Sequence, residues 1–170
     1  MSFCKTAKLS LRLIVLGATC LSQAAFAADA AGVLNVSATV AADCVVGTST
    51  LAFGTVLSTA IQAGNVDSTG NVTVNCSYGV NYTVELDKGA GVGATFARRK
   101  MTVSGNKLDY SIYISTARTD VWGNGTAGSE TVEGTGTGAS QSLSAYGRIF
   151  SGQNPPTGAY TDTVNVTVSY

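Results

Sequence analysis

The sequence predicts an all-β protein, and three observations lead to that prediction. Apolar and polar residues alternate with a period of two in segments rich in Val, Thr, Ile and Tyr, as expected for strands with one buried face. Clusters of Gly, Asn, Asp and Ser interrupt these segments at intervals of about ten residues. No segment repeats apolar residues at the i, i+3, i+4, i+7 spacing over three helical turns. We therefore expect two packed antiparallel sheets.

The first 27 residues have the features of a secretory signal peptide. Three basic residues precede an apolar stretch from Leu13 to Phe26, and Ala25-Phe26-Ala27 fits a small-x-small cleavage site. An uncleaved membrane anchor is the alternative, but polar residues interrupt the stretch and it is shorter than ~20 residues. Cys20 could carry a lipid anchor, although Thr19 stands where a small residue normally precedes such a cysteine. We expect cleavage after Ala27.

The remaining 143 of the 170 residues are enough for one domain. Removal of the leader takes three of the ten basic residues and none of the ten acidic ones, which leaves a net charge of −3. A mildly acidic secreted chain has no electrostatic basis for binding nucleic acid. The only basic cluster, Arg98-Arg99-Lys100, is expected to keep a loop or strand edge soluble. Because the chain has no histidine, we expect neither a histidine-dependent catalytic triad nor a typical zinc site, and no cofactor or metal.

The alternating segments predict eight strands in the mature chain. They are Gly32–Val40, Thr50–Val56, Asn71–Tyr78, Asn81–Asp87, Lys100–Val103, Leu108–Ser115, Ser140–Ile149 and Tyr160–Tyr170. The Gly/Thr-rich segment 123–139 has too few apolar residues to order itself and is predicted to be a long mobile loop. Residues 151–158 hold both prolines and are predicted to turn into the last strand.

Cys44 and Cys76 are the two cysteines that remain after cleavage. In an oxidising compartment such a pair predicts one disulfide, which would stabilise the fold by about 3 to 4 kcal/mol in the chain-entropy treatment. A reactive or metal-binding pair is the alternative, but the two residues lack a CxxC spacing.

The two ends of the mature chain carry complementary patterns. In the last strand Val164, Val166 and Val168 share one face, and the sequence ends two residues later, so we expect this strand to lack one neighbour. The apolar face of the first segment consists of Leu34, Val36, Ala38 and Val40. This segment precedes Cys44 and could fill the gap beside the last strand, either within one molecule or between molecules. The intermolecular arrangement would build a head-to-tail fibre.

Several aromatic residues could instead line a sugar-binding surface. They are Tyr82, Tyr113, Trp122 and Tyr146. Aromatic residues at strand positions more often pack in the core or across strands, and we favour that interpretation.

A group of short motifs is spread over the mature chain. The motifs are Cys44-Val45-Val46-Gly47, Phe53-Gly54-Thr55-Val56, Val72-Thr73-Val74-Asn75-Cys76, Tyr82-Thr83-Val84-Glu85-Leu86-Asp87, Leu108-Asp109-Tyr110-Ser111-Ile112-Tyr113, Ala117-Arg118-Thr119 and the ending from Gly158 to Val168. Together they resemble the spore coat protein U domain family, which includes the major subunits of archaic, Csu-type chaperone–usher pili. The ending, Gly-x-Tyr-x-Asp-Thr-Val-x-Val-Thr-Val, is the most specific of these motifs. The resemblance covers essentially the whole mature chain.

The resemblance implies an incomplete immunoglobulin-like β-sandwich that a donated strand completes. It divides the chain into a signal peptide (1–27), an N-terminal donor-strand extension (28–43) and a pilin domain (44–170). Leu34, Val36, Ala38 and Val40 would be the plug residues, and Val164, Val166 and Val168 would line the acceptor groove. The Cys44–Cys76 pair would match the family disulfide.

The function implied is that of a structural subunit, not an enzyme, in a surface pilus for adhesion and biofilm formation. Its partners would be identical subunits, a periplasmic chaperone and an outer-membrane usher, with minor or tip pilins as further candidates. The protein would be secreted through the periplasm to the cell surface. A self-complemented secreted binding module and a spore-coat or matrix protein are the alternatives.

Overall fold

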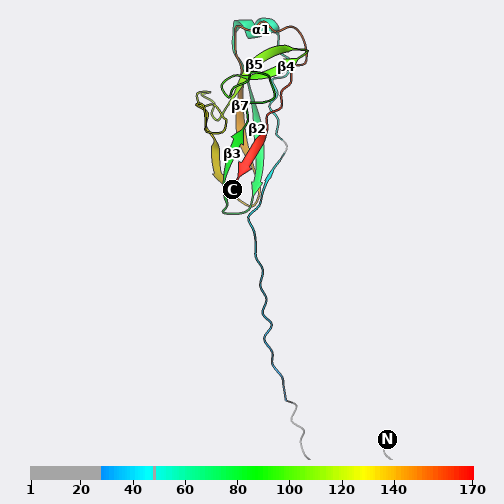
Figure 1. Cartoon of the computed structure of the whole chain (residues 1–170), viewed down its shortest axis with the longest axis vertical. Coiled ribbons are helices and arrows are strands. Elements are labelled where there is room, and N and C mark those ends of the chain that lie inside the picture. Colours follow the sequence, from blue (N-terminus) through cyan, green and yellow to red (C-terminus); the bar gives the residue numbers. More distant parts are fainter. Residues whose placement is uncertain (1–27, 48) are drawn as a thin grey trace, which may run out of the picture. The chain divides into compact units, whose positions relative to one another are not determined.

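A computed structural model describes residues 28–47 and 49–170, in which strands and loops account for nearly all of the chain (Figure 1). The predicted signal peptide, 1–27, lies outside the described residues. The elements in chain order are β1 (Cys44–Val46), α1 (Ser58–Ala63), β2 (Val66–Cys76), β3 (Asn81–Leu86), β4 (Arg99–Val103), β5 (Asn106–Tyr113), β6 (Val132–Thr135), β7 (Ser140–Ile149) and β8 (Val166–Ser169). The prediction of an all-β fold is confirmed.

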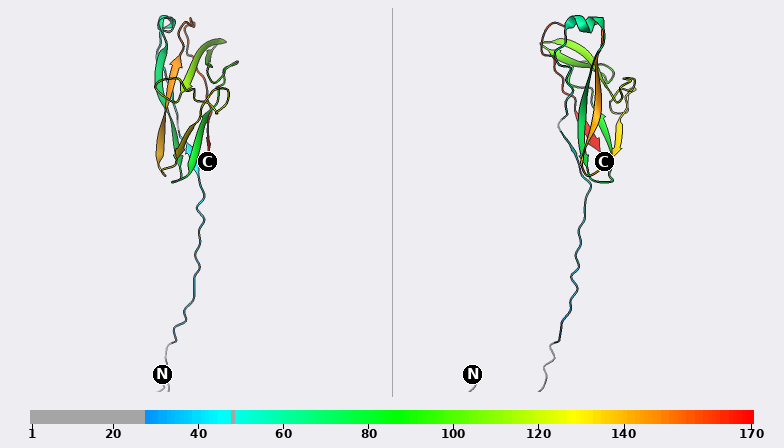
Figure 2. Two further views of the ribbon diagram at one scale, coloured as in Figure 1. Left: turned by 90° about the vertical axis from the view of Figure 1, so that its left-hand side faces the viewer. Right: turned by 180° about the vertical axis from the view of Figure 1, so that it is seen from behind.

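The strands form two sheets, seen from two further sides in Figure 2. The larger sheet has the order β1-β2-β7-β5-β4, and the smaller one has the order β6-β3-β8. Every pair of neighbouring strands is antiparallel. The longest pair, β2 with β7, matches Val66 with Ile149 at one end and Asn75 with Ser140 at the other. This pair forms the middle of the larger sheet.

Alternation along the strands builds the core between the two sheets. In β3, for example, Tyr82, Val84 and Leu86 are buried, whereas the residues between them are more exposed. The same period of two buries one face of β2, whereas both faces of β5 are buried from Tyr110 to Tyr113. Trp122 is fully buried and its indole N–H donates to the Val84 carbonyl over 3.0 Å. Tyr82 and Tyr113 are also buried, so three of the four candidate sugar-binding aromatics belong to the interior.

The disulfide between Cys44 and Cys76 is present. It joins directly opposite residues of β1 and β2. Asp43, just before it, is held by Ser77: the Ser77 N–H donates to the Asp43 carbonyl over 2.9 Å, and the Asp43 N–H donates to Ser77 Oγ over 3.1 Å. The start of the sandwich is therefore fixed to the β2–β3 turn by covalent and hydrogen bonds.

The structure corrects the prediction for the Gly/Thr-rich segment 123–139. Its second half contains β6, which pairs with β3 from Val84 opposite Val132 to Asn81 opposite Thr135. In its first half Ser129 is buried, and its hydroxyl donates to the Thr126 carbonyl over 2.7 Å. Backbone pairing with a long neighbouring strand orders a segment whose own side chains could not.

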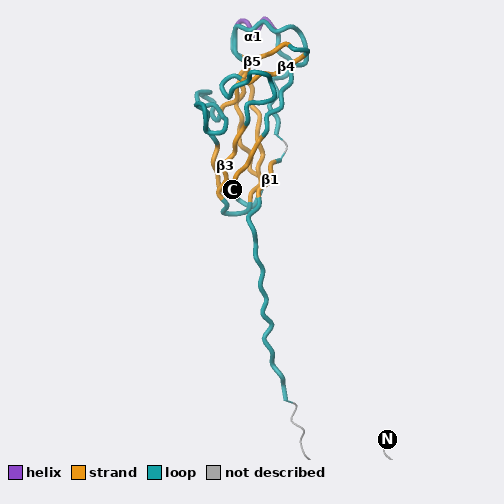
Figure 3. Tube along the Cα trace, in the orientation of Figure 1, coloured by secondary structure: helices purple, strands orange, loops and turns teal. Residues whose placement is uncertain are grey.

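Three predicted strands form less pairing than expected. In Tyr160–Tyr170 the ladder is limited to β8, Val166–Ser169, with one further bridge from Thr161 to Thr102. In Thr50–Val56 only Thr50 makes a bridge, to Asn71, although half-buried and exposed residues still alternate along the segment. Residues 28–43, which include the predicted strand Gly32–Val40, form neither helix nor strand (Figure 3). Alternation gives a segment one apolar face, but a ladder of backbone hydrogen bonds also needs a neighbouring strand.

The basic cluster 98–100 is also corrected, because its three residues have different environments. Arg99 is fully buried, and its guanidinium donates to the backbone carbonyls of Asp87, Phe96 and Trp122 at 2.7 to 3.1 Å. Burial lowers the pKa of Arg99 from its ordinary value. Lys100 pairs with Asp109 over 2.7 Å. Arg99 therefore joins three loops from the interior, where we expected a solvated residue.

The chain divides into two units, residues 1–38 and 39–170. Within the described part of either unit, no helix has the length and apolar character needed to cross a membrane.

Candidate functional site

The candidate site lies beside the last strand. One edge of β8 pairs with β3, from Leu86 opposite Val166 to Thr83 opposite Ser169. Among residues 28–47 and 49–170, no strand pairs with its other edge. The free edge carries backbone donors and acceptors that an additional strand could satisfy.

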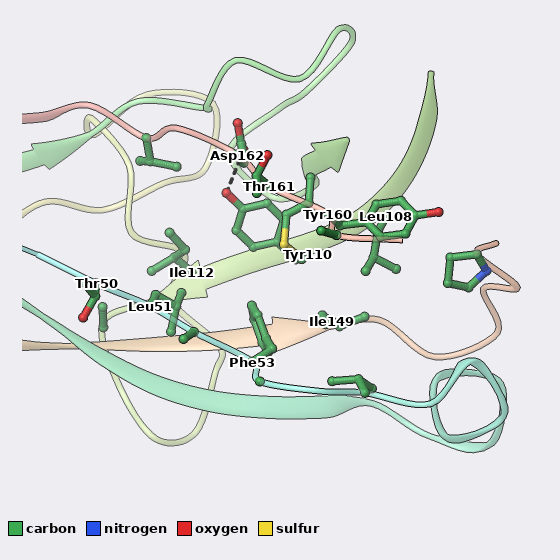
Figure 4. A pocket seen from close by; sticks show the side chains of 18 of the residues that line it. Thr50, Leu51, Phe53, Leu108, Tyr110, Ile112, Ile149, Tyr160, Thr161 and Asp162 are labelled. Atoms are coloured by element: carbon green, nitrogen blue, oxygen red, sulfur yellow. Dashed lines mark hydrogen bonds between the residues drawn. The ribbon is translucent and has the colours of Figure 1, made fainter. Parts of the chain in front are cut away.

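A largely apolar cavity of about 730 Å³ opens next to this segment. Its base is formed by Leu108, Tyr110 and Ile112 of β5 and by Ile149 of β7. One wall is the segment 49–56, and the other is the segment 155–166 that leads into β8. Figure 4 shows Leu51 and Phe53 on one side, Tyr160 to Asp162 on the other, and Tyr110 between them. The two walls come from opposite ends of the sandwich sequence.

Two glycines allow the first wall to lie close to the sheet. A Cβ at Gly70 of β2 would come within 2.0 Å of the Thr50 carbonyl oxygen. A Cβ at Gly147 of β7 would come within 2.8 Å of both the Leu51 and Phe53 side chains. The Phe53 ring then packs edge-on to Tyr110, with 6.3 Å between ring centroids. The wall is therefore packed onto the core without forming a ladder.

Asp162 anchors the second wall. Its carboxylate accepts hydrogen bonds from the Tyr110 hydroxyl over 2.7 Å and from the backbone N–H groups of Ala90 and Thr163, each over 2.8 Å. Burial raises the pKa of the Tyr110 hydroxyl, and the hydrogen bond to Asp162 raises it further. Tyr110 is thus a neutral donor inside the cavity, and it holds the wall to the floor.

A second aspartate fixes the residues where β8 begins. Asp87 Oδ1 accepts hydrogen bonds from the Asn165 N–H over 3.0 Å and the Gly89 N–H over 2.8 Å. The Asp87 N–H donates to the Asn165 carbonyl over 3.0 Å. Its own carbonyl accepts from buried Arg99. The position of Val164 and Val166 beside the cavity is therefore set by a polar network on the opposite face of the chain.

The residues predicted for the acceptor groove lie as follows. Val164 and Val166 line the cavity. Val168 lies on the same face of β8 and packs against the core, but it is outside the cavity lining. All three side chains are half-buried, and the residues between them are exposed.

The residues predicted for the donor segment have the opposite environment. Leu34 is 87% exposed, Val36 83% and Val40 94%, and Ala38 is also exposed. These are unusual values for a row of aliphatic side chains. The apolar face of the segment has no covering in the chain as described.

The first wall and the floor of the cavity are parts of the site that the sequence pattern does not predict. The relevant signals are present: Leu51 and Phe53 alternate with the residues between and after them, and so do Leu108, Tyr110 and Ile112. Alternation predicts ordinary strands at both places, because it does not show that two segments leave a space between them.

The site offers backbone pairing and apolar burial, with little polar chemistry. The one carboxylate in the lining, Asp162, already accepts three hydrogen bonds. Within the described ranges, no group of three His, Cys, Asp or Glu residues could hold a metal ion. The arrangement is suited to receiving an extended chain.

Two antiparallel sheets around one core, with a free edge beside an open apolar cavity, define a class of immunoglobulin-like β-sandwich. The Spore Coat Protein U domain matches residues 30–167, and the chain belongs to this family. The chain is 33% identical over 157 residues to Protein U of Myxococcus xanthus, and the match covers 85% of this chain and 87% of that protein.

A solved structure shows the same fold. It is a chain of the CsuC–CsuE chaperone–tip adhesion subunit pre-assembly complex from archaic chaperone–usher Csu pili of Acinetobacter baumannii, with a TM-score of 0.54 and 23% identity. The match covers 78% of this chain and 40% of that chain. The prediction of a spore coat protein U domain with an immunoglobulin-like fold is confirmed.

Proposed function

We propose that this protein is a structural subunit of an archaic chaperone–usher surface pilus and that it polymerises by donor-strand exchange. The observation that carries the proposal is the presence, in one chain, of an exposed alternating apolar segment and a free strand edge beside an apolar cavity. Residues 28–43 are the donor extension. Leu34, Val36, Ala38 and Val40 are its plug residues, and Val164, Val166 and Val168 form the acceptor wall of the next subunit.

The physical properties of the two parts fit such a joint. Four side chains spaced by two residues extend over about 20 Å of strand. Burying each contributes roughly 1 to 3 kcal/mol, and each new backbone hydrogen bond adds about 1 kcal/mol net. Release requires the ladder and the plug to separate together, so the polymer would be kinetically stable without a covalent link between subunits.

The proposal extends to how the subunit is handled before assembly. An exposed apolar groove and a free edge favour aggregation, so a periplasmic chaperone would cover them until an outer-membrane usher joins the subunits. The fold neighbour is a subunit that was solved with its chaperone. After cleavage of residues 1–27 the protein would pass through the periplasm to the cell surface, where the fibre would serve adhesion and biofilm formation. Minor or tip pilins would be further partners.

A matched pair of variants tests the donor segment. Val36→Arg places a charge on the apolar face, and Asn35→Arg places the same charge on the opposite face. We expect Val36→Arg to abolish polymer and Asn35→Arg to preserve it, because an arginine in the apolar cavity would lose its hydration, and the one carboxylate of the lining, Asp162, already accepts three hydrogen bonds. The readout is gel electrophoresis of surface-sheared protein without heating. Wild-type polymer from Val36→Arg would refute strand exchange at this site.

A coat or matrix protein built by the same strand exchange is the second candidate, favoured by the match to the Spore Coat Protein U domain. Electron microscopy of the sheared material separates the two. Thin fibres support the pilus, and a continuous layer supports the coat.

A further inference from the structure

A second contact between subunits follows from how short the connection is between the plug and the sandwich. This inference rests on the proposed strand exchange. Val40 is the last plug residue, and Asp43 is already fixed to Ser77 by backbone and side-chain hydrogen bonds. Three residue steps span at most about 11 Å. When Val40 occupies a neighbour's cavity, the corner formed by Asp43 and Ser77 must therefore lie close to the mouth of that cavity.

The corner carries an exposed aromatic side chain. Tyr78 follows Ser77 in the β2–β3 turn and is 87% exposed. The turn is held in place because the Gly79 N–H donates to the Gly136 carbonyl over 2.9 Å. We call Asp43, Ser77, Tyr78 and Gly79 the exit corner. A tyrosine on a fixed turn loses little conformational entropy on binding, so it is suited to an interface.

The direction of the donor strand determines which end of the neighbour it meets. All strand pairs of the sandwich are antiparallel. β8 begins beside the cavity and runs toward the end of the sandwich where the β2–β3 turn lies (Figure 1). A donor strand antiparallel to β8 places Leu34 toward that end and Val40 toward the end with α1. The cavity extends to this end of the sandwich, because Ser58, Ile61 and Pro155 line it.

The α1 end is built as a firm surface with exposed apolar groups. Ser58 Oγ donates to the Pro155 carbonyl over 3.1 Å, and Gln62 Nε2 donates to Asn154 Oδ1 over 2.7 Å. These bonds join α1 to the proline loop. Leu57, the residue before Ser58, is 68% exposed. Pro156, the residue after Pro155, is exposed and lines the cavity. We call Leu57, α1 and residues 154–156 the platform.

We propose that the exit corner of each subunit packs on the platform of the subunit that receives its donor strand, with Tyr78 against Leu57 and Pro156. The partner is a second copy of this chain. The contact would cover apolar side chains at both ends of the sandwich and would restrict rotation about the short connection. The fibre geometry would then depend on this contact as well as on the inserted strand.

Photo-crosslinking tests this contact. The variant Tyr78→p-benzoylphenylalanine carries the crosslinker on the exit corner, and Thr119→p-benzoylphenylalanine carries it on an exposed loop between β5 and β6 as the control. Sheared fibres are irradiated and then boiled with reductant, so that only photochemical links survive. Cleavage before aspartate gives separate peptides for Tyr78 (67–86), Leu57 (43–66) and Pro156 (120–161).

We expect a boiled dimer from the Tyr78 variant that joins peptide 67–86 to 43–66 or 120–161, and no such dimer from the control. A ladder in unheated wild-type protein together with a 67–86 to 67–86 link, or with no link, would overturn the contact and leave strand exchange intact. Absence of the ladder from wild-type protein would overturn strand exchange, and this contact with it.

Discussion

Residues 34–40 and residues 164–168 have the same sequence pattern and opposite environments. Both alternate small or medium apolar residues with polar ones. The valines of the C-terminal segment are half-buried against the core, and β3 pairs with the strand they belong to. The aliphatic side chains of the N-terminal segment are more than four-fifths exposed at Leu34, Val36 and Val40. Alternation therefore predicts which face of a segment is to be buried, but it does not predict which segment or molecule buries that face.

Polar anchoring distinguishes the two segments. Asp87 and Asp162 hold the C-terminal segment through Asn165 and Tyr110. The disulfide and the Asp43–Ser77 hydrogen bonds begin only after the N-terminal segment has ended. A segment with an apolar face and no polar anchor can pair with a strand of another molecule, as strand exchange requires.

The largest expected effect comes from deleting residues 28–41. If this segment contributes nothing to its own sandwich, the deletion should leave the far-ultraviolet circular dichroism and the unfolding midpoint of the purified monomer unchanged. Polymer should be lost completely, because no donor remains. Loss of the folded monomer would instead show that the segment completes its own domain, as expected for a self-complemented binding module.

Removing the disulfide should have the next largest effect, this time on the sandwich. The double variant Cys44→Ser, Cys76→Ser should lower the free energy of unfolding by about 3 kcal/mol, because the unfolded chain gains the freedom of an open loop. Urea unfolding of the monomer measures this loss. Wild-type protein treated with reductant under native conditions is the matched control. An unchanged free energy of unfolding in both would show that Asp43 and Ser77 alone fix the start of the sandwich.

Tyr110→Phe should cost about 1 kcal/mol, since Asp162 loses one of its three donors. The effect should depend on pH. The pKa of Tyr110 is raised in the folded state, so above about pH 10 the unfolded chain releases this proton while the folded chain keeps it. Stability should fall as pH rises through that value, and less steeply in the variant.

The measurement is urea unfolding from pH 8 to pH 11, with Tyr78→Phe as a control at an exposed tyrosine. Equal slopes against pH in wild type and Tyr110→Phe would contradict the assignment of Tyr110 as a buried neutral donor.

Asp67→Asn should have the smallest effect. Asp67 accepts hydrogen bonds from Arg148 over 2.7 and 2.8 Å, and this contact lowers the pKa of the carboxyl below its ordinary value. Because the pair is partly exposed, the loss should be a few tenths of a kcal/mol to about 1 kcal/mol at neutral pH. The difference in the free energy of unfolding between wild type and variant should vanish as pH falls through the lowered pKa. There the wild-type Asp67 is protonated and therefore uncharged, like the asparagine. A difference that persists in acid would mean that packing, and not charge, is lost.

Much of the sandwich could be predicted from the sequence. The strands around Val72–Cys76, Asn81–Leu86, Leu108–Tyr113 and Ser140–Ile149 lie where alternation places them, because each has a neighbouring strand on both sides. The cysteine pair was predictable from its number and compartment. Strand β6 was missed because its order comes from β3, while its own composition, rich in Gly and Thr, favours a loop.

The candidate site was predictable only on one side. Alternation identified Val164, Val166 and Val168, but nothing in the sequence shows that residues 49–56 pack over Gly70 and Gly147 to form the facing wall. The burial of Arg99 was likewise hidden, because its partners are backbone carbonyls from three loops. Contacts between distant segments depend on how the chain folds back, and a local pattern carries no information about this.

The most direct test of strand exchange is denaturing gel electrophoresis of natively produced, surface-sheared protein, with one half left unheated and the other half boiled. The account predicts a ladder at multiples of the mature mass in the unheated half. Boiling should collapse the ladder to one band, and reductant should leave it unchanged because the only disulfide of the described chain lies within one subunit. A single monomer band in both halves would contradict the account and would favour a self-complemented domain.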